Sequence, residues 1–102
     1  MKNGVRLSLR ALIYPENGWW IAHCLELDLV AEGETPLKAF EALQSLTELQ
    51  VETAMDEGNL QSIFRQAPPE ILAAFATAQD RSFRRKLPRR VERFDVRELQ
   101  PA

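Results

Sequence analysis

The pattern of apolar and polar residues begins with a strict alternation near the N-terminus. Apolar side chains occupy every second position from Val5 to Ile13, and mostly polar residues stand between them. This period of two predicts a strand with one buried face. The run Pro-Glu-Asn-Gly at positions 15–18 has the composition of a turn, so the aromatic segment 19–24 is expected to form the second strand of a hairpin.

Two adjacent tryptophans begin this second segment. Successive side chains of a strand point to opposite faces, so Trp19 and Trp20 are expected to diverge. One should join the core, and the other should lie beneath a helix, the tail of the chain or a second subunit, because an exposed tryptophan is unusual. An acidic bend over 25–28 then leads to a third short strand over 29–32.

In the next segment the apolar residues recur with the spacing of a helix rather than that of a strand. Thr35 is suited to the N-cap and Pro36 to the first helical position. The helix is expected to run to about Met55 and to stop near Gly58. Its apolar residues cover more than half of the circumference. One face of a sheet needs less than this, so a second element or a partner subunit is expected on the remaining flank.

The pattern is weaker after residue 58. It indicates a short helical turn near residues 60–64, a helix beginning at positions 68–69, a charged segment over 80–90 and a strand over 91–99. The predicted class is therefore α+β, with a three-stranded antiparallel sheet packed on one long helix. We assign residues 1–58 to this β-β-β-α domain and residues 59–102 to a helical and basic C-terminal extension.

Composition adds a charge asymmetry to this picture. The 102 residues suit one small domain, and neither a membrane-spanning run nor a signal peptide is recognisable, so a cytoplasmic protein is expected. The single cysteine, Cys24, is consistent with a reducing compartment. Residues 1–60 carry four basic and ten acidic side chains, whereas residues 61–102 carry nine and five. Two such parts either serve separate purposes or attract each other.

No residue pattern here is typical of catalysis. His23 and Cys24 are neighbours in a strand, so their side chains diverge, and no second histidine is present to complete a common zinc site. Four acids lie on or near the bend, Glu26, Asp28, Glu32 and Glu34, but they lack a convergent set of donors for Mg²⁺. We therefore expect no enzymatic activity, no cofactor and no metal.

A basic run near the C-terminus suggests a second kind of partner. Its candidate nucleic-acid contacts are Arg84, Arg85, Lys86, Arg89 and Arg90. Such runs are more often solvated surface, and this one has a single aromatic residue, Phe83. An acidic edge of the same subunit or of a neighbouring one is the alternative partner of this run.

Two stretches of the chain resemble the HicB-like antitoxin family of bacterial toxin–antitoxin systems. The segment Gly-Trp-Trp-Ile-Ala-His-Cys-Leu-Glu-Leu at 18–27 is similar to that family's glycine, aromatic, apolar, alanine, cysteine, acidic and leucine strand pattern. The segment Val-Ala-Glu-Gly-Glu-Thr-Pro-Leu-Lys-Ala at 30–39 is similar to its strand-to-helix junction. The resemblance covers about residues 5–55.

The resemblance implies a partial RNase H-like fold without nuclease activity. It also implies a homodimer or higher homo-oligomer that binds and masks a small basic RNA-cleaving toxin, as in type II systems. The candidate partner contacts are Trp19, Trp20, Glu26, Asp28, Glu41 and Glu48. Two alternatives stand beside this interpretation: a nucleic-acid-binding transcriptional regulator that uses the basic segment, and an orphan oligomerising domain without a toxin.

Overall fold

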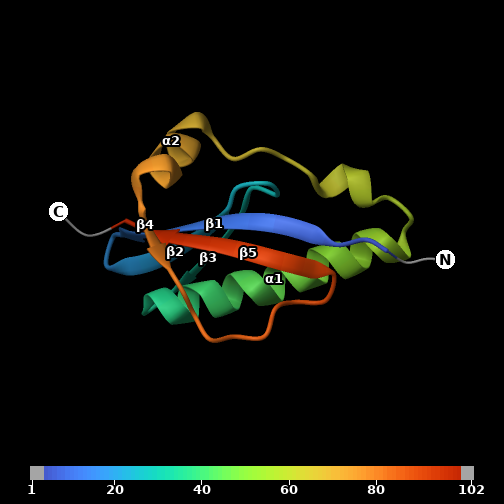
Figure 1. Ribbon diagram of the computed structural model, residues 1–102, viewed down its shortest axis with the longest axis horizontal. Helices are drawn as coiled ribbons and strands as arrows, with labels where there is room; N and C mark the ends of the chain where they lie inside the picture. Colours follow the sequence, from blue (N-terminus) through green and yellow to red (C-terminus); the bar gives the residue numbers. More distant parts are fainter. Residues whose placement is uncertain (1–3, 100–102) are drawn as a thin grey trace.

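The computed structural model describes residues 4–99, which form one mixed sheet with helical segments on both faces (Figure 1). In chain order the elements are β1 (Leu7–Glu16), β2 (Trp19–Cys24), β3 (Leu29–Gly33), α1 (Pro36–Asp56), the 3-10 helix η1 (Leu60–Ile63), α2 (Pro69–Thr77), β4 (Gln79–Arg81) and β5 (Val91–Glu98). The predicted α+β class is confirmed.

The sheet has five strands in the order β3-β2-β1-β5-β4. β1 pairs antiparallel with β2 but parallel with β5, and the two edge strands pair antiparallel with their neighbours. The three predicted strands, β1, β2 and β3, pair antiparallel as expected, but the prediction of a three-stranded sheet is wrong in strand number, because β4 and β5 complete the sheet and β5 pairs parallel with β1. The alternation along β1 reveals a half-buried strand, but it carries no information about which distant segment completes the sheet.

Residues on both sides of position 58 contribute to the same core. Val91 and Val96 of β5 belong to one buried cluster with Leu9 and Ile13 of β1. The register places Leu9 beside Phe94 and Ala11 beside Val96, so apolar side chains of the two parallel strands share one face. The division of the chain into two domains at this position stays a prediction.

Local sequence signals fix both ends of α1. The Thr35 hydroxyl accepts a hydrogen bond from the Lys38 amide at 3.1 Å, and proline opens the first turn. After the helix, Gly58 has φ +67°, a conformation that glycine adopts without steric cost. The helix predicted from about residue 35 to residue 55 is confirmed within one residue at its end.

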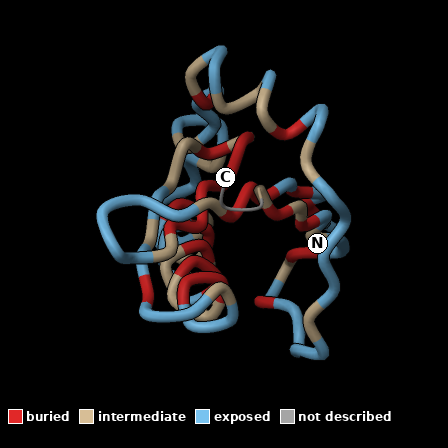
Figure 2. Tube along the Cα trace, turned by 90° about the vertical axis from the view of Figure 1, so that its left-hand side faces the viewer, coloured by how far each residue is buried: buried red, intermediate tan, exposed pale blue. Residues whose placement is uncertain are grey.

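α1 covers one face of the sheet. Ala39, Phe40 and Leu43 are buried against the inward residues of the strands, and Figure 2 shows buried positions along both layers with exposed positions on the outer turns. This pairing of an apolar helix stripe with an apolar sheet face forms the main core.

The second face of the sheet carries a smaller cluster. Phe75 of α2 and Ala67 of the segment before it pack on Leu12 and Leu25. Arg97 of β5 lies over the Phe75 ring, 4.6 Å from its centre, and its Nη1 donates to the Phe75 carbonyl oxygen at 2.8 Å. The cation thus satisfies a carbonyl in the last turn of α2, where a positive charge is favourable.

The connection between β4 and β5, residues 82–90, crosses the flank of α1, and we call it the strap (Figure 1). The Phe83 ring stacks on Phe40 with centres 5.2 Å apart, and Pro88 is buried. The Gln44 side-chain amide donates to the Lys86 carbonyl oxygen at 3.3 Å. The strap is a second element on α1, as the wide apolar arc of that helix predicts.

Candidate protein-binding surface

The two tryptophans diverge as the strand period predicts. Trp20 packs against the main core, whereas Trp19 is 45% exposed. Val30 of β3, on the same face as Trp19, is 48% exposed. Val30 was not identified from the sequence, because its alternation with Ala31 indicates which face it occupies but not whether that face is covered. Two large apolar side chains therefore lie open on one face, at the β2–β3 end of the sheet.

Acidic residues border these two apolar side chains. Glu16 stands directly opposite Trp19 in the β1–β2 register, and Glu32 stands opposite Ile21 in the β2–β3 register. Residues that are opposite each other in a ladder share a face. We call the surface formed by Glu16, Trp19, Val30 and Glu32 the β2–β3 face.

The electrostatic environment of Tyr14 supports a negative potential beside this face. Burial raises the pKa of the Tyr14 phenol, and the negative charges of Glu16 and Asp28 raise it further. The hydroxyl lies 3.4 Å from Nδ1 of His23. A cationic group that docks here would therefore meet a favourable potential.

His23 is buried and lies in a polar contact chain on the same face of the sheet. Its Nε2 lies 2.7 Å from Oδ1 of Asp28, and its Nδ1 faces the Tyr14 hydroxyl. Asp28, one of the predicted partner contacts, lies in the bend between β2 and β3 and has φ +52°. Its contact with His23 connects this bend to β2. Sequence reasoning did not find this pairing, because Asp28 lies outside the strand.

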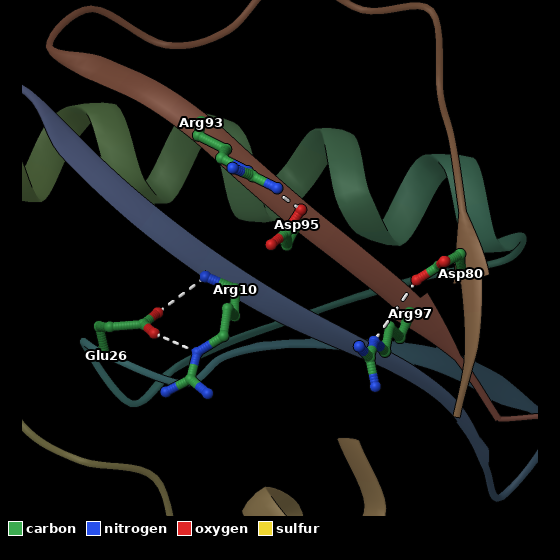
Figure 3. Close-up of polar contacts among 6 residues, drawn as sticks. All are labelled: Arg10, Glu26, Asp80, Arg93, Asp95 and Arg97. Atoms are coloured by element: carbon green, nitrogen blue, oxygen red, sulfur yellow. Dashed lines mark hydrogen bonds and ion pairs between the residues drawn. The ribbon is translucent and has the colours of Figure 1, made fainter. Parts of the chain in front are cut away.

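Glu26 is engaged within the chain as well. One carboxylate oxygen accepts from the Arg10 amide at 2.7 Å and the other pairs with the Arg10 guanidinium (Figure 3). The same view shows two arginine–aspartate pairs, Arg93–Asp95 within β5 and Arg97–Asp80 between β5 and β4. The Glu26 carboxylate thus ties the bend to β1.

The structure brings the acidic helix face and the basic run together. Glu41 of α1 lies 2.9 Å from Arg85 of the strap, and Glu52 lies 3.8 Å from Arg89 and 3.6 Å from Arg90. These two surfaces were predicted as separate contact sites. In the folded chain each partly neutralises the other, the arrangement anticipated from the charge asymmetry.

The other predicted residues of these two surfaces remain more accessible. Glu48 lines an open groove of about 590 Å³ between α1 and the strap, opposite Lys86 and Arg89. Arg84 and Lys86 are exposed and form no ion pair with any residue in the described range 4–99. Two of the five predicted nucleic-acid contacts therefore keep unneutralised charge.

The chemistry of Cys24 fits a packing role. The side chain is fully buried on the α1 face, while His23 points to the opposite face. Burial raises the pKa of the Cys24 thiol from 9.0 to about 11, so its reactive thiolate form is scarce at neutral pH. Within residues 4–99, no group of three His, Cys, Asp or Glu side chains is arranged to hold a metal ion.

Comparisons with protein-family models, with curated proteins and with solved structures find no significant match to this chain. No helix in the described part of the chain combines the length and the apolar character needed to cross a bilayer.

Proposed function

We propose that this chain is a non-catalytic, antitoxin-like module of a type II toxin–antitoxin system. It acts in the cytoplasm, self-associates, and binds and masks a small basic RNA-cleaving toxin. The observation that carries the proposal is the β2–β3 face, where exposed Trp19 and Val30 share one side of the sheet with the carboxylates of Glu16 and Glu32. The HicB-like resemblance supplies the class of partner.

The composition of this face suits a basic protein partner. Aromatic residues are enriched among the side chains that contribute most to protein–protein binding, and a tryptophan 45% exposed has much apolar area left to bury. The neighbouring carboxylates attract cationic side chains and increase the rate of encounter. A toxin that binds RNA needs a basic surface, so it has the complementary charge.

The test is co-expression with the small basic protein encoded in the adjacent reading frame. We expect a co-purifying complex in which RNA cleavage by the partner is suppressed. Trp19→Ala should weaken binding about thirtyfold, the scale of a central aromatic contact. The matched control is Leu49→Ala, because Leu49 is 64% exposed but lies on α1. A partner that cleaves RNA equally with and without the chain contradicts the proposal.

The alternative of a nucleic-acid-binding regulator rests on Arg84 and Lys86. It predicts DNA binding that weakens steeply with salt and that is lost when both residues are replaced by alanine. The pairing of Arg85 with Glu41, and of Arg89 and Arg90 with Glu52, favours the protein-binding proposal, because these three cations already contact carboxylates. A chain that self-associates but binds neither toxin nor DNA is the orphan oligomerising domain.

A further inference from the structure

β3 is an edge strand with one side left to pair. Among residues 4–99, β2 is the only strand that pairs with β3, and no further backbone hydrogen bond from this part of the chain reaches it. Its five residues contain no proline, and its pairing with β2 shows no register shift. Proline and a β-bulge, two features that can protect an edge, are therefore absent from β3, and the strand is open to pairing with another segment.

A groove continues from the beginning of this edge toward α1. It has a volume of about 340 Å³, with Leu27, Leu29, Ala54 and Ile63 as its apolar lining and with Asp28 and Glu57 among its polar residues. At the other end of β3, α1 packs directly on one face of the strand. A Cβ added to Gly33 would lie only 2.5 Å from the Ala39 amide nitrogen, so the helix backbone abuts that residue. The candidate site is the edge of residues 29–32 together with the groove.

We propose that β3 receives an extended, lysine- or arginine-rich segment of the partner protein by strand addition. Backbone hydrogen bonds form along the open edge, and alternate side chains of the added strand fall on the two faces of the sheet. Those on the α1 side lie beside the groove, whose apolar lining includes Leu29 and Ile63. Those on the other side lie beside Val30 and Glu32, where a basic side chain reaches the carboxylate.

Charge selects this occupant over a second copy of the chain. Asp28, Glu32 and Glu57 lie along the edge and the groove, against one groove cation, Arg65. Two copies paired through β3 would place these acidic edges side by side, which is unfavourable, whereas a basic strand neutralises them. This inference rests on the proposed function for the identity of the partner, but not for the chemistry of the segment.

The test uses a peptide of alternating valine and lysine as the probe, with a peptide of alternating valine and glutamate as its control. Amide hydrogen exchange of the full chain is followed by NMR. At ten times its Kd, the lysine peptide should slow exchange of the outward-facing β3 amides about tenfold, while the glutamate peptide leaves them unchanged. Glu32→Lys should weaken binding about tenfold. Glu92→Lys, the same change at an exposed position of β5, should weaken it less than twofold.

Three results overturn the inference. The first is equal protection by the glutamate peptide, and the second is binding of the lysine peptide without protection of β3 amides. The third is concentration-dependent protection of these amides without any peptide, which identifies a second copy as the occupant.

The two proposals fail separately. A toxin that is masked while the β3 amides remain unprotected contradicts strand addition alone. Protection by the lysine peptide in a chain that masks no toxin supports strand addition and contradicts the antitoxin assignment.

Discussion

Cys24 shows how burial controls chemistry at the residue scale. Its thiol is enclosed between β2 and α1 with no exposed surface. Removing a proton there creates a charge without solvent, and this raises the pKa of the thiol to about 11. The same burial makes the folded state sensitive to alkaline pH.

We predict that stability falls as pH rises from 9 to 11. In this range the unfolded chain loses the Cys24 proton while the folded chain keeps it, so folding becomes less favourable as the pH increases toward the folded-state pKa. A shift from 9.0 to about 11 corresponds to roughly 2–3 kcal/mol. Urea unfolding at a series of pH values checks this. The free energy of unfolding of Cys24→Ala, relative to its own value at pH 7, should decline less steeply with pH. An equal decline in both proteins would show that Cys24 is not the cause.

Gly33 is a second residue whose surroundings decide its identity. A Cβ at this position would lie 2.5 Å from the backbone nitrogen of Ala39 and 2.7 Å from the carbonyl carbon of Lys38. We predict that Gly33→Ala destabilises the protein by about 3 kcal/mol, because the first turn of α1 must move away from β3. Thermal unfolding measures the change. Gly4→Ala, where nothing lies within 4 Å of an added Cβ, is the control and should change stability by less than about 0.5 kcal/mol.

At the scale of elements, the strap joins two sets of residues that looked independent in the sequence. Phe83 anchors it by packing on Phe40, and Arg85 and Arg90 extend toward the carboxylates of α1. Phe94 adds an edge-to-face contact with Phe40 at 5.2 Å between ring centres. The apolar contacts and the ion pairs make unequal contributions, because the Glu41–Arg85 pair is partly open to solvent.

We predict that the aromatic anchor contributes more to stability than the ion pair does. Phe83→Ala should cost about 2 kcal/mol, because it removes a ring from the Phe40 cluster. The coupling between Glu41→Gln and Arg85→Gln in a double-mutant cycle should be below about 1 kcal/mol and should decrease with salt. Both are read from denaturant unfolding. A coupling larger than the cost of Phe83→Ala would reverse this order.

At the scale of the whole molecule, β5 makes the fold depend on both ends of the described chain. It lies between β1 and β4 and contributes Val91 and Val96 to the main core. Parallel pairing with β1 needs a long connection, and α1, η1, α2 and the strap all lie within it. The fold thus closes only when a late segment returns beside the first strand.

We predict that residues 1–58 do not fold alone as a monomer. Without β5, one backbone edge of β1 is left unpaired, and Leu9 and Ala11 lose the apolar neighbours Phe94 and Val96. Far-UV circular dichroism and amide dispersion in NMR spectra measure the outcome, with a chain ending at Leu99 as the control. Cooperative unfolding of the fragment would instead establish residues 1–58 as an independent domain.

The sequence alone was sufficient where the signal is local. The alternation before Ile13, the Asn-Gly turn, and the Thr35-Pro36 cap each involve residues a few positions apart, and the structure has the corresponding strand, hairpin and helix. The divergence of Trp19 and Trp20 follows from the same two-residue period. The candidate surface was therefore predictable in its tryptophan, but not in Val30, whose exposure depends on what the rest of the chain leaves uncovered.

Tertiary structure decided the contacts between residues distant in sequence. The parallel pairing of β5 with β1 and the Arg85–Glu41 pair depend on where a long connection returns, and hydrophobic periodicity contains no information about this. It also decided which charges remain available, because the basic strap lies against acidic α1 while the acids near β3 stay at an open edge. A local pattern specifies which face of an element is buried, and only the packed chain specifies which neighbour covers it.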